Sequence, residues 1–590
     1  MTFSNLAEYF SALEKTTLRL KITEILAEIL NKVSLNEVDK ICYLSLGRLA
    51  PLYAGIEFNL AEKLMIKAIS QAFNLEEKEI KKIYKSLGDL GDVVYYLKGG
   101  KEKKGEKNFS VEEIYQRLQE IAQESGEGSV ERKISKMANL IIDLDPLSAK
   151  YTVRIPLGRL RLGFSELTIL DALSWMLVGD KRLRGEIESA YNVLADVGKI
   201  AQEIKKQKSG LPQKEIEEKI KEKLKEIKPQ LGVPIMPSLC QRLPTPEEMI
   251  KKMGKVAAEP KFDGTRLQLH WQKGGKVWIF TRNLENVTTM FPDIVEASKK
   301  EIKANQVILD GEAIGYDPKS GKFLPFQETI KRKRKYEVDQ KAKEIPLKYF
   351  VFDILYKDGK SLLNLPLKKR REILNQVLKK DNQRIVLTPQ IITEDPNELR
   401  KFHDQQIKAG LEGAVVKKWQ SFYQPGRRGY NWVKFKAEKK GKKGGGLADT
   451  LDCLVMGLYK GKGKRASFGV GAFLVGVKKS EKVEEFLTIS KIGTGLSDEQ
   501  WKELEERGEK LKAVKKPEGY KVDKNLTPDI WLIPSLVVEV EADNITLSPV
   551  HTAGMALRFP RLLRFRDDKF PQQVTTLKEV KKLYEMQTKI

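Results

Sequence analysis

Hydrophobic periodicity changes near residue 230 of this 590-residue chain, and the change limits the folds that the chain can adopt. Before that point, apolar residues recur every three or four positions, for example in residues 18–30 and 216–227, as they do in amphipathic helices. After it, apolar and polar residues alternate, for example in residues 267–271, as they do in half-buried strands. The sequence therefore predicts a helical first part followed by mixed α and β structure.

Two segments mark the predicted domain boundaries. Residues 228–246 contain five prolines, which favour extended structure over helix, and residues 439–446 (KKGKKGGG) form a charged, glycine-rich joint. Beyond the joint, the predicted elements are short strands at 451–459, 468–477, 486–491 and 535–542 and a helix at 577–586. We therefore predict an all-α domain at 1–230, an α+β domain at 231–438, and a small β-barrel of the oligonucleotide-binding (OB) type at 439–590.

The chain is strongly basic, with 107 Lys and Arg against 81 Asp and Glu and a formal net charge of +26. Such an excess favours a polyanionic partner through counterion release. The alternative is the charged surface of a thermophilic protein, because 32% of the residues are charged, and basicity alone does not separate the two. The basic run at 331–335 is of a kind that is usually just solvated, so it carries no prediction about localisation.

Neither a metal cluster nor a membrane segment is evident in the sequence. The three cysteines, Cys42, Cys240 and Cys453, lie far apart, and so do the three histidines, so no zinc cluster is predicted. No stretch reaches the roughly 18 apolar residues that span a bilayer, and residues 1–10 lack the pattern of a signal peptide. We expect a soluble intracellular protein, cytoplasmic if its source is prokaryotic, in a reducing compartment and with no membrane partner.

One lysine has the setting of a covalent nucleophile. Lys261 begins the hexapeptide Lys-Phe-Asp-Gly-Thr-Arg, between an extended apolar segment at 256–260 and a strand-like run at 267–280. A lysine amine attacks only in its neutral form, which a nearby cation such as Arg266 would favour. The alternative is a surface hairpin with a tight turn at Asp263 and Gly264, and six residues alone do not decide between the two.

Acidic residues further along could complete such a site. Asp310 and Glu312 are two positions apart on a predicted strand, so their side chains point to one face, where they suit magnesium or a ribose hydroxyl. Glu412 opens a similar segment that ends at Lys417, and two carboxylates from separate strands could bracket one metal ion. Strand-end turn residues are the alternative.

Basic and aromatic residues could hold an anionic ligand. Alternation places Trp432, Lys434 and Lys436 on one face of a strand, which favours a polyanion there, although lysines also protect solvent-facing edge strands. Arg428 could add a guanidinium, and Phe352 could stack on a purine, although the aromatic run at 349–356 is more typical of a core strand. Near the end, apolar residues alternate with arginines that could bind one anion together: Arg558, Arg561, Arg564 and Arg566.

Taken in order, these segments resemble the covalent nucleotidyltransferases, and within them the ATP-dependent DNA ligases of the archaeal and eukaryotic replicative type. The matching stretches are KFDGTR (261–266), FTRNLENVT (280–288), LDGEAIGYD (309–317), YFVFDILY (349–356), EGAVVKK (412–418), WVKFK (432–436) and ALRFPRLLRFRDDK (556–569). The helical part, including residues 154–173, is similar to the DNA-binding domain of that family. The resemblance therefore spans essentially the whole chain.

The resemblance implies a nucleotidyltransferase (adenylation) domain between the helical domain and the OB-fold domain, with ATP and Mg²⁺ as co-substrate and cofactor. Lys261 would take AMP from ATP and pass it to the 5′-phosphate of a nick in double-stranded DNA, and the 3′-hydroxyl would then displace the AMP, in replication, repair and recombination. The implied nucleotide contacts are Glu259, Arg266, Arg282, Glu312, Phe352, Arg428, Lys434, Lys436, Arg558 and Arg561; the implied metal ligands are Glu312 and Glu412; the implied DNA contacts are Arg159 and Arg161. The last domain would close over ATP by bending at residues 439–446.

Departures and alternatives narrow the resemblance. Phe262 stands where tyrosine is commoner in the family. The helical part lacks an evident motif for binding a sliding clamp, so the sequence does not establish a clamp as a partner. We expect the protein to be a monomer. RNA ligases and mRNA capping enzymes share the lysine motif, but the long helical part and the arginine-rich end argue against both. An NAD-dependent ligase would need a four-cysteine zinc module. A catalytically silent nucleic-acid-binding scaffold is disfavoured because the residues of the motifs are all retained.

Overall fold

The computed structural model describes the chain except for residues 17, 101–105, 209–212, 335–336, 380, 437–449, 462–468, 482 and 589–590. The chain forms two compact units, residues 1–435 and 436–590. The first unit contains both the helical part and the mixed part, so the predicted division at residue 230 lies inside one unit. The predicted joint at 439–446 lies outside the described residues.

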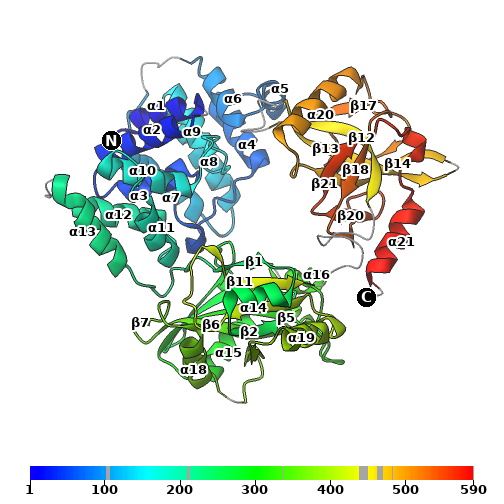
Figure 1. The fold of residues 1–590 in the computed structure, drawn as a ribbon. Helices are drawn as coiled ribbons and strands as arrows, with labels where there is room; N and C mark the ends of the chain where they lie inside the picture. Colours follow the sequence, from blue (N-terminus) through cyan, green and yellow to red (C-terminus); the bar gives the residue numbers. More distant parts are fainter. Residues whose placement is uncertain are drawn as a thin grey trace. The chain divides into compact units, whose positions relative to one another are not determined.

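Helices form the first part of the first unit, as the periodicity predicts, and Figure 1 shows them packed together. They are α1 Phe3–Glu14, α2 Arg19–Lys32, α3 Val38–Ser45, α4 Glu62–Phe73, α5 Glu77–Leu87, α6 Leu90–Leu97, α7 Val111–Gln123, α8 Ser129–Asp143, α9 Pro146–Arg154, α10 Glu166–Val178, α11 Arg184–Val193, α12 Val197–Lys208 and α13 Gln213–Glu226, with a 3₁₀ turn at Leu52–Ala54. Their apolar faces meet in one core, in which α10 packs on α2 and α6 packs on α9. The predicted stripe at 18–30 is wrong at its start, because Leu18 precedes α2 and both Leu18 and Leu20 are exposed.

Two sheets form the rest of the first unit. One has the strand order β1-β11-β10-β2-β9, and the other has the order β4-β3-β5-β6-β7 with β8 beside β6. The strands are β1 Leu239–Arg242, β2 Val256–Pro260, β3 Thr265–Gln272, β4 Lys276–Thr281, β5 Gln306–Gly315, β6 Leu347–Lys357, β7 Lys360–Ser361, β8 Ile385–Leu387, β9 Ile391–Thr393, β10 Gly413–Lys418 and β11 Arg428–Lys436.

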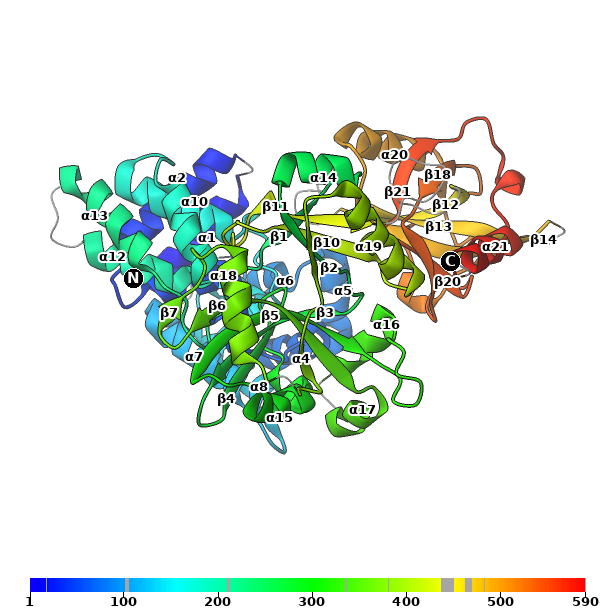
Figure 2. The same ribbon diagram turned by 60° about the horizontal axis from the view of Figure 1, so that its bottom comes forward.

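Each sheet has helices on one face, as Figure 2 shows. Helices α14 Pro246–Met253 and α19 Pro396–Lys408 pack on the five-stranded sheet, and α15 Pro292–Glu301 and α18 Leu367–Val377 pack on the six-stranded sheet. The shorter elements are α16 Phe326–Thr329, α17 Val338–Glu344 and 3₁₀ turns at Thr288–Met290 and Ile330–Arg332. The opposite faces of the two sheets share a small apolar cluster that includes Ile308 and Trp432.

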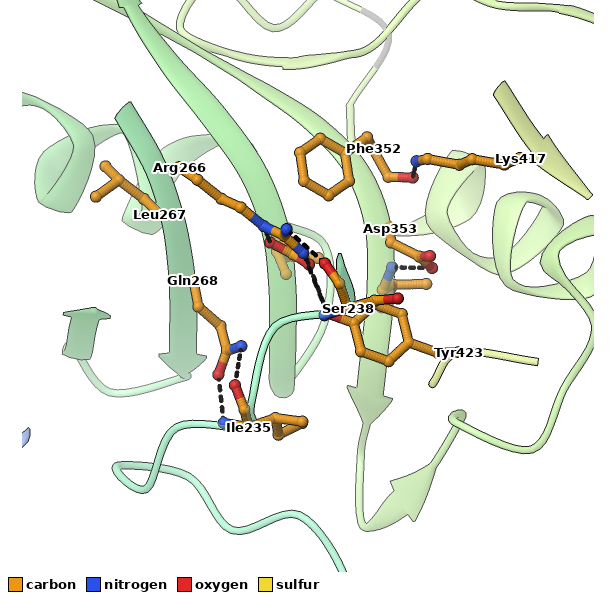
Figure 3. Close-up of polar contacts among 12 residues, drawn as sticks. Ile235, Ser238, Arg266, Leu267, Gln268, Phe352, Asp353, Lys417 and Tyr423 are labelled. Atoms are coloured by element: carbon orange, nitrogen blue, oxygen red, sulfur yellow. Dashed lines mark hydrogen bonds and ion pairs between the residues drawn. The ribbon is translucent and has the colours of Figure 1, made fainter. Parts of the chain in front are cut away.

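The proline-rich segment that marks the predicted first boundary is anchored to β3. Alternate side chains of β3 bind its backbone: Gln268 exchanges two hydrogen bonds with Ile235, at 2.8 and 3.0 Å, and Arg266 donates to the Ser238 carbonyl at 2.8 Å (Figure 3). Further along β3, His270 Nδ1 accepts from the Gly232 N–H at 3.2 Å, and burial lowers the pKa of His270 to about 3, which keeps the ring neutral. One face of β3 therefore positions the start of the mixed part.

The predicted alternative of a hairpin at Asp263 and Gly264 is wrong, because β2 and β3 belong to different sheets. Gly264 is needed for close approach rather than for a turn: a Cβ there would lie 2.3 Å from the Ala313 carbonyl oxygen on β5. A tight turn at Gly274 and Gly275 joins β3 to the antiparallel β4, and both residues have positive φ, at 98° and 96°. Lys261 therefore lies in a connection between two sheets.

The second unit is built mainly on one eight-stranded sheet, in which β12, β13 and β14 are antiparallel neighbours and β18 pairs with β12 and β21. Its elements are β12 Leu451–Lys460, β13 Val470–Ser480, β14 Val483–Ile492, α20 Asp498–Lys510, β15 Lys512–Ala513, β16 Tyr520–Lys521, β17 Ile530–Leu532, β18 Val537–Glu541, β19 Asn544–Leu547, β20 Met555–Arg558, β21 Arg561–Phe565 and α21 Leu577–Thr588, with 3₁₀ turns at Lys524–Leu526 and Pro571–Gln573. The predicted strands correspond to β12, β13, β14 and β18, and the predicted helix to α21, although residue 468 lies outside the described part. Among the described residues, no helix has both the length and the apolar character needed to cross a membrane.

Helix α18 carries a buried ion pair that we expect to stabilise the first unit. Arg370 binds both oxygens of Asp353, at 2.7 and 2.9 Å, and also donates to the carbonyls of Leu365 and Ser421, and neither side chain of the pair is exposed. Removing one partner leaves the other charge buried and uncompensated.

We therefore expect Arg370→Met to lower the free energy of unfolding by about 3–5 kcal/mol. Lys369, one position earlier on α18, pairs with Glu372 at the surface, so Lys369→Met is the matched control and should change stability by no more than about 0.5 kcal/mol. Urea unfolding of the three proteins measures both values. Similar losses in the two variants would contradict a structural role for the buried pair.

Candidate active site

Lys261 follows β2 and contacts the segment that precedes β10. Its backbone N–H donates to the Gly413 carbonyl at 2.9 Å, and the Glu412 N–H donates to the Lys261 carbonyl at 3.2 Å. Its Nζ forms an ion pair with Glu412 Oε2, and both side chains are partly exposed. The structure thus brings the predicted nucleophile into direct contact with one of the predicted metal ligands.

Arg266 lies at the centre of a buried polar network (Figure 3). Its Nε and Nη2 donate to the two oxygens of Asp310, at 3.0 and 2.7 Å, and the Tyr423 hydroxyl donates to Asp310 Oδ2 at 2.8 Å. Because Asp310 neutralises its charge, Arg266 contributes less positive field at Lys261 than the sequence suggested. Asp310 itself is occupied by Arg266 and Tyr423, so the pairing of Asp310 with Glu312 as ligands of one metal or ribose is not what the structure shows.

Glu312 is a carboxyl group whose acidity the surrounding protein alters strongly. Glu312 lies on β5 opposite Arg266 of β3. Burial raises the pKa of Glu312 to about 8; the positive charges of Lys261 and Arg266 lower this pKa, and the negative charge of Asp310 raises it further. No cluster of three or more metal-binding side chains occurs among the described residues. Glu412 contacts Lys261, and the charge of Lys261 acts on Glu312; carboxylates are of the type that magnesium takes one or two of, with phosphate and water oxygens in its other positions.

Glu259 on β2 forms a second buried ion pair, with Lys417 on β10. The distance from Lys417 Nζ to Glu259 Oε2 is 2.7 Å, and burial raises the pKa of Glu259 while Lys417 opposes the rise. Lys417 Nζ also donates to the Phe352 carbonyl at 3.1 Å and lies 4.4 and 4.3 Å from the ring centres of Phe352 and Trp432. The sequence pattern assigned Lys417 no role, although a lysine that directly follows the apolar residues Val415 and Val416 of a strand can signal a buried partner.

The predicted alternation of β11 is confirmed. Val433 and Phe435 pack in the core under α14 and α19. Trp432 lies in the apolar cluster on the opposite face of the sheet, and Lys434, two positions later on the strand, is on the same face as Trp432. Burial raises the pKa of the Cys240 thiol. The positive charges of four residues near the thiol oppose that rise: Arg266, Lys417, Lys261 and Lys434. The structure therefore brings Lys434 to the same place as Lys261 and Arg266.

Three other predicted contacts lie at the margins of this region. Arg282 is exposed and lines a small hollow with Arg266 and Asp310. Arg428 is exposed at the start of β11, and Lys436 is the last residue of that strand.

The arginines near the end of the chain belong to the second unit, where Arg561, Arg564 and Arg566 pair with carboxylates and the last two share Glu539. Arg561 pairs with Asp543 at 2.9 Å, Arg564 pairs with Glu539 at 2.7 Å, and the Arg558 guanidinium lies 5.2 Å from the Phe559 ring centre. The Arg561 and Arg564 side chains are more than half exposed, so their ion pairs lie at the surface of the unit. In this structure, however, Arg561 and Arg564 have different partners rather than a common one.

The two predicted DNA contacts lie in the loop after α9. Arg159 is exposed and pairs with Glu62, and Arg161, which has a positive φ of 60°, pairs with Asp89 at 3.2 Å and donates to the Gly88 carbonyl at 2.8 Å. A left-handed backbone is uncommon for a residue with a side chain, so this loop is held in a specific conformation. Its DNA contacts stay a prediction.

Three family models match the chain in order. The model described as "DNA ligase N terminus" matches residues 2–174, "ATP dependent DNA ligase domain" matches residues 237–436, and "ATP dependent DNA ligase C terminal region" matches residues 466–569. The second match contains Lys261 and the two buried ion pairs of the site. Together the three matches cover more than half of the chain.

Individual proteins agree with the family models. A "Probable DNA ligase" of Dictyoglomus thermophilum is 45% identical over 100% of this chain and 98% of its own length, and a "DNA ligase" of Acidianus ambivalens is 38% identical with the same coverage. The solved structure named "Pmar-Lig_Pre." is similar in fold, with a TM-score of 0.55 and 17% identity over 95% of this chain and 99% of its own. The chain therefore belongs to the family of ATP-dependent DNA ligases.

Proposed function

We propose that Lys261 carries AMP between ATP and nicked DNA in the ligase reaction. The observation that supports this role is the contact of Lys261 Nζ with Glu412 in a region that also contains Glu312, Arg266 and Lys434. Lys261 Nζ attacks the α-phosphorus of ATP, so that an N–P bond forms and pyrophosphate leaves. The 5′-phosphate of the nick then attacks the same phosphorus and frees the lysine, and the 3′-hydroxyl finally displaces AMP.

The residues around Lys261 have distinct tasks in this scheme. The lysine must lose a proton before it attacks, and its contact with Glu412 Oε2 holds Nζ in place in the free protein. Glu312 and Glu412 would hold Mg²⁺, which when bound neutralises charge on the transferred phosphate. Glu259 and Phe352 would hold the adenine base. The residues left for ribose and phosphate contacts are Arg266, Arg282, Arg428, Lys434 and Lys436.

The finer domain assignment is part of the same proposal. We assign residues 1–230 to DNA binding, with Arg159 and Arg161 on the DNA, residues 231–438 to adenylation, and residues 439–590 to an OB-fold domain. The antiparallel order of β12, β13 and β14, with β18 on the other side of β12, supports a barrel-like sheet. Arg558 and Arg561 would bind the pyrophosphate. The protein would act as a monomer, and a sliding clamp is a possible partner for which the sequence has no clear binding motif.

Labelling with ATP tests the role of Lys261. After incubation with magnesium and ATP labelled at the α-phosphate, we expect label on the protein that survives denaturing electrophoresis and that nicked DNA removes. Lys261→Ala should take up none, because the nucleophile is absent. Lys255→Ala is the control, since Lys255 precedes the same strand and makes only an exposed ion pair with Glu394, and it should label normally. Label from GTP but not ATP, or label on Lys261→Ala, would disprove the proposal.

The raised pKa of Glu312 predicts a pH-dependent cost to stability. The pKa rises from an ordinary 4.5 to about 8, so the folded protein holds a proton that the unfolded chain has lost, and Glu312 lowers stability increasingly as pH rises through this range. Glu312→Gln should therefore be more stable than the parent protein at pH 8.5, by about 2 kcal/mol after allowance for partial exposure, and the gap should narrow at pH 5.

Unfolding at several pH values measures this difference. Glu296→Gln is a suitable control, because Glu296 is an exposed residue whose pKa its partner Lys299 lowers through a hydrogen bond. That control should show no gain at high pH. A gap between Glu312→Gln and the parent that is constant from pH 5 to pH 8.5 would contradict the raised pKa.

The proposed role of Arg561 concerns the first step of the reaction, the transfer of AMP to Lys261, and not the final sealing of the nick. If Arg561 binds pyrophosphate, Arg561→Ala should slow the labelling of Lys261 by about 100-fold, because a charge that stabilises the leaving group is lost. Sealing of a nick that already carries AMP should stay close to the parent rate. Arg507→Ala is the control, since Arg507 pairs with Asp567 in the same unit. Equal slowing of both steps would show that Arg561 does not act on pyrophosphate.

A further inference from the structure

Glu259 and Arg371 place two buried polar atoms side by side without hydrogen-bond partners. Arg371 lies on α18, its Nη2 donates to the Thr388 carbonyl, and its Nη1 lies 4.0 Å from Glu259 Oε1. Both side chains are more than nine-tenths buried. In the described part of the chain, neither Arg371 Nη1 nor Glu259 Oε1 makes a hydrogen bond, and neither does the Thr388 hydroxyl. A donor and an acceptor with unused capacity therefore lie together in the protein interior.

Such atoms are uncommon, because a buried polar group without a partner loses the hydrogen bonds that water would give it. The neighbouring arginine shows the usual arrangement: Arg370 bonds to both oxygens of Asp353 and to two backbone carbonyls. The other oxygen of Glu259 is likewise satisfied, by Lys417. Within the pair, the unused capacity lies on the atoms of Glu259 and Arg371 that face one another, and among the described residues the Thr388 hydroxyl and the Trp432 indole N–H also lack hydrogen-bond partners.

The position of the pair links it to the nucleotide site. Lys417, the partner of Glu259, also binds the Phe352 carbonyl and lies against the Phe352 ring, the predicted stacking partner of the base. The residue after Glu259 is Pro260, which has no N–H to offer a base. Lys417 is already bonded to Glu259 Oε2 and to the Phe352 carbonyl, so the charged donor with unused capacity beside Glu259 Oε1 is Arg371 Nη1.

We propose that Glu259 and Arg371 together recognise the Watson–Crick edge of adenine, with Glu259 Oε1 accepting from the N6 amino group and Arg371 Nη1 donating to N1. The inference rests on the proposed function, since it takes ATP as the bound nucleotide, and it adds Arg371 as a specificity-determining residue. Adenine presents a donor at N6 beside an acceptor at N1, which matches a carboxylate beside a guanidinium.

The same pair rejects guanine and hypoxanthine. Both bases carry an acceptor, O6, and a donor, N1–H, in the reverse order, so O6 would face the carboxylate and N1–H would face the guanidinium. A carboxylate cannot donate when ionised, and a guanidinium cannot accept. Each wrong base would therefore leave two buried polar contacts unmade, and a site of this kind discriminates strongly.

Nucleotide analogues test the inference through the initial rate of Lys261 labelling. 1-Deaza-ATP replaces N1 by C–H and removes only the acceptor that Arg371 would bind. The parent protein should use ATP about 10- to 100-fold better than 1-deaza-ATP in kcat/KM, and Arg371→Met should reduce this preference to near unity. The preference for ATP over the purine riboside triphosphate, which lacks the N6 amine, should persist in Arg371→Met because Glu259 is unchanged.

Two controls separate recognition from support of Glu259. Arg371→Lys should restore part of the N1 preference, because it returns one donor, and Thr388→Val should keep the full preference, because the hydroxyl is not the reader of N1. Equal use of ATP and 1-deaza-ATP by the parent protein would overturn the inference whether or not any variant folds. It would also be overturned if Arg371→Met slowed the two nucleotides equally, or if Thr388→Val abolished the preference. If ATP did not label the parent protein at all, the proposed function would fail instead.

Discussion

The buried ion pair between Arg266 and Asp310 is the contact on which the geometry of the active site depends. Arg266 lies on β3 and Asp310 on β5, both in the six-stranded sheet, but the guanidinium also holds the Ser238 carbonyl just before β1 of the other sheet. Tyr423, from the connection between β10 and β11, closes the network on Asp310. Burying two charges is costly, and here the cost is offset because each charged group has several partners. Lys261, five residues before Arg266, therefore has a defined place between the sheets.

Lys417 forms the second charged link between the sheets and sets the polarity of the nucleotide region. It joins Glu259 on β2 to the Phe352 carbonyl on β6. Lys417 and Arg266 thus each have a carboxylate partner, whereas Glu312 lies near Asp310, which adds to the effect of burial on its pKa. An added cation would therefore stabilise the charged form of Glu312. The proposed magnesium ion would meet that need and would supply the charge neutralisation that phosphoryl transfer requires.

Sequence predicted what depends on local pattern. Helical periodicity gave the helices before residue 230, alternation gave the two faces of β11, and the ordered motifs gave Lys261, Glu312 and Glu412 as neighbours in function. It did not predict that β2 and β3 lie in different sheets, because sheet membership depends on pairing with distant strands. The basic run at 331–335 shows the same limit: Arg332, which the pattern places among solvated residues, is buried against Asp293, 39 positions away. The burial of a charge is decided by its partner, and the partner is not local.

The consecutive arginines of α18 show how one helix can serve both stability and recognition. Neighbouring residues on a helix point about 100° apart, so Arg370 and Arg371 reach different partners although they are adjacent in sequence. Arg370 uses its donors within the protein, so its contribution is the same with or without a ligand. Arg371 leaves one donor unused beside an unused acceptor of Glu259, at a cost of about 1–3 kcal/mol for each such group in the free protein. That cost disappears only when a ligand supplies an acceptor for Arg371 and a donor for Glu259. The unpaired atoms that destabilise the free site therefore favour adenine over guanine and hypoxanthine, whose donor and acceptor are in the reverse order.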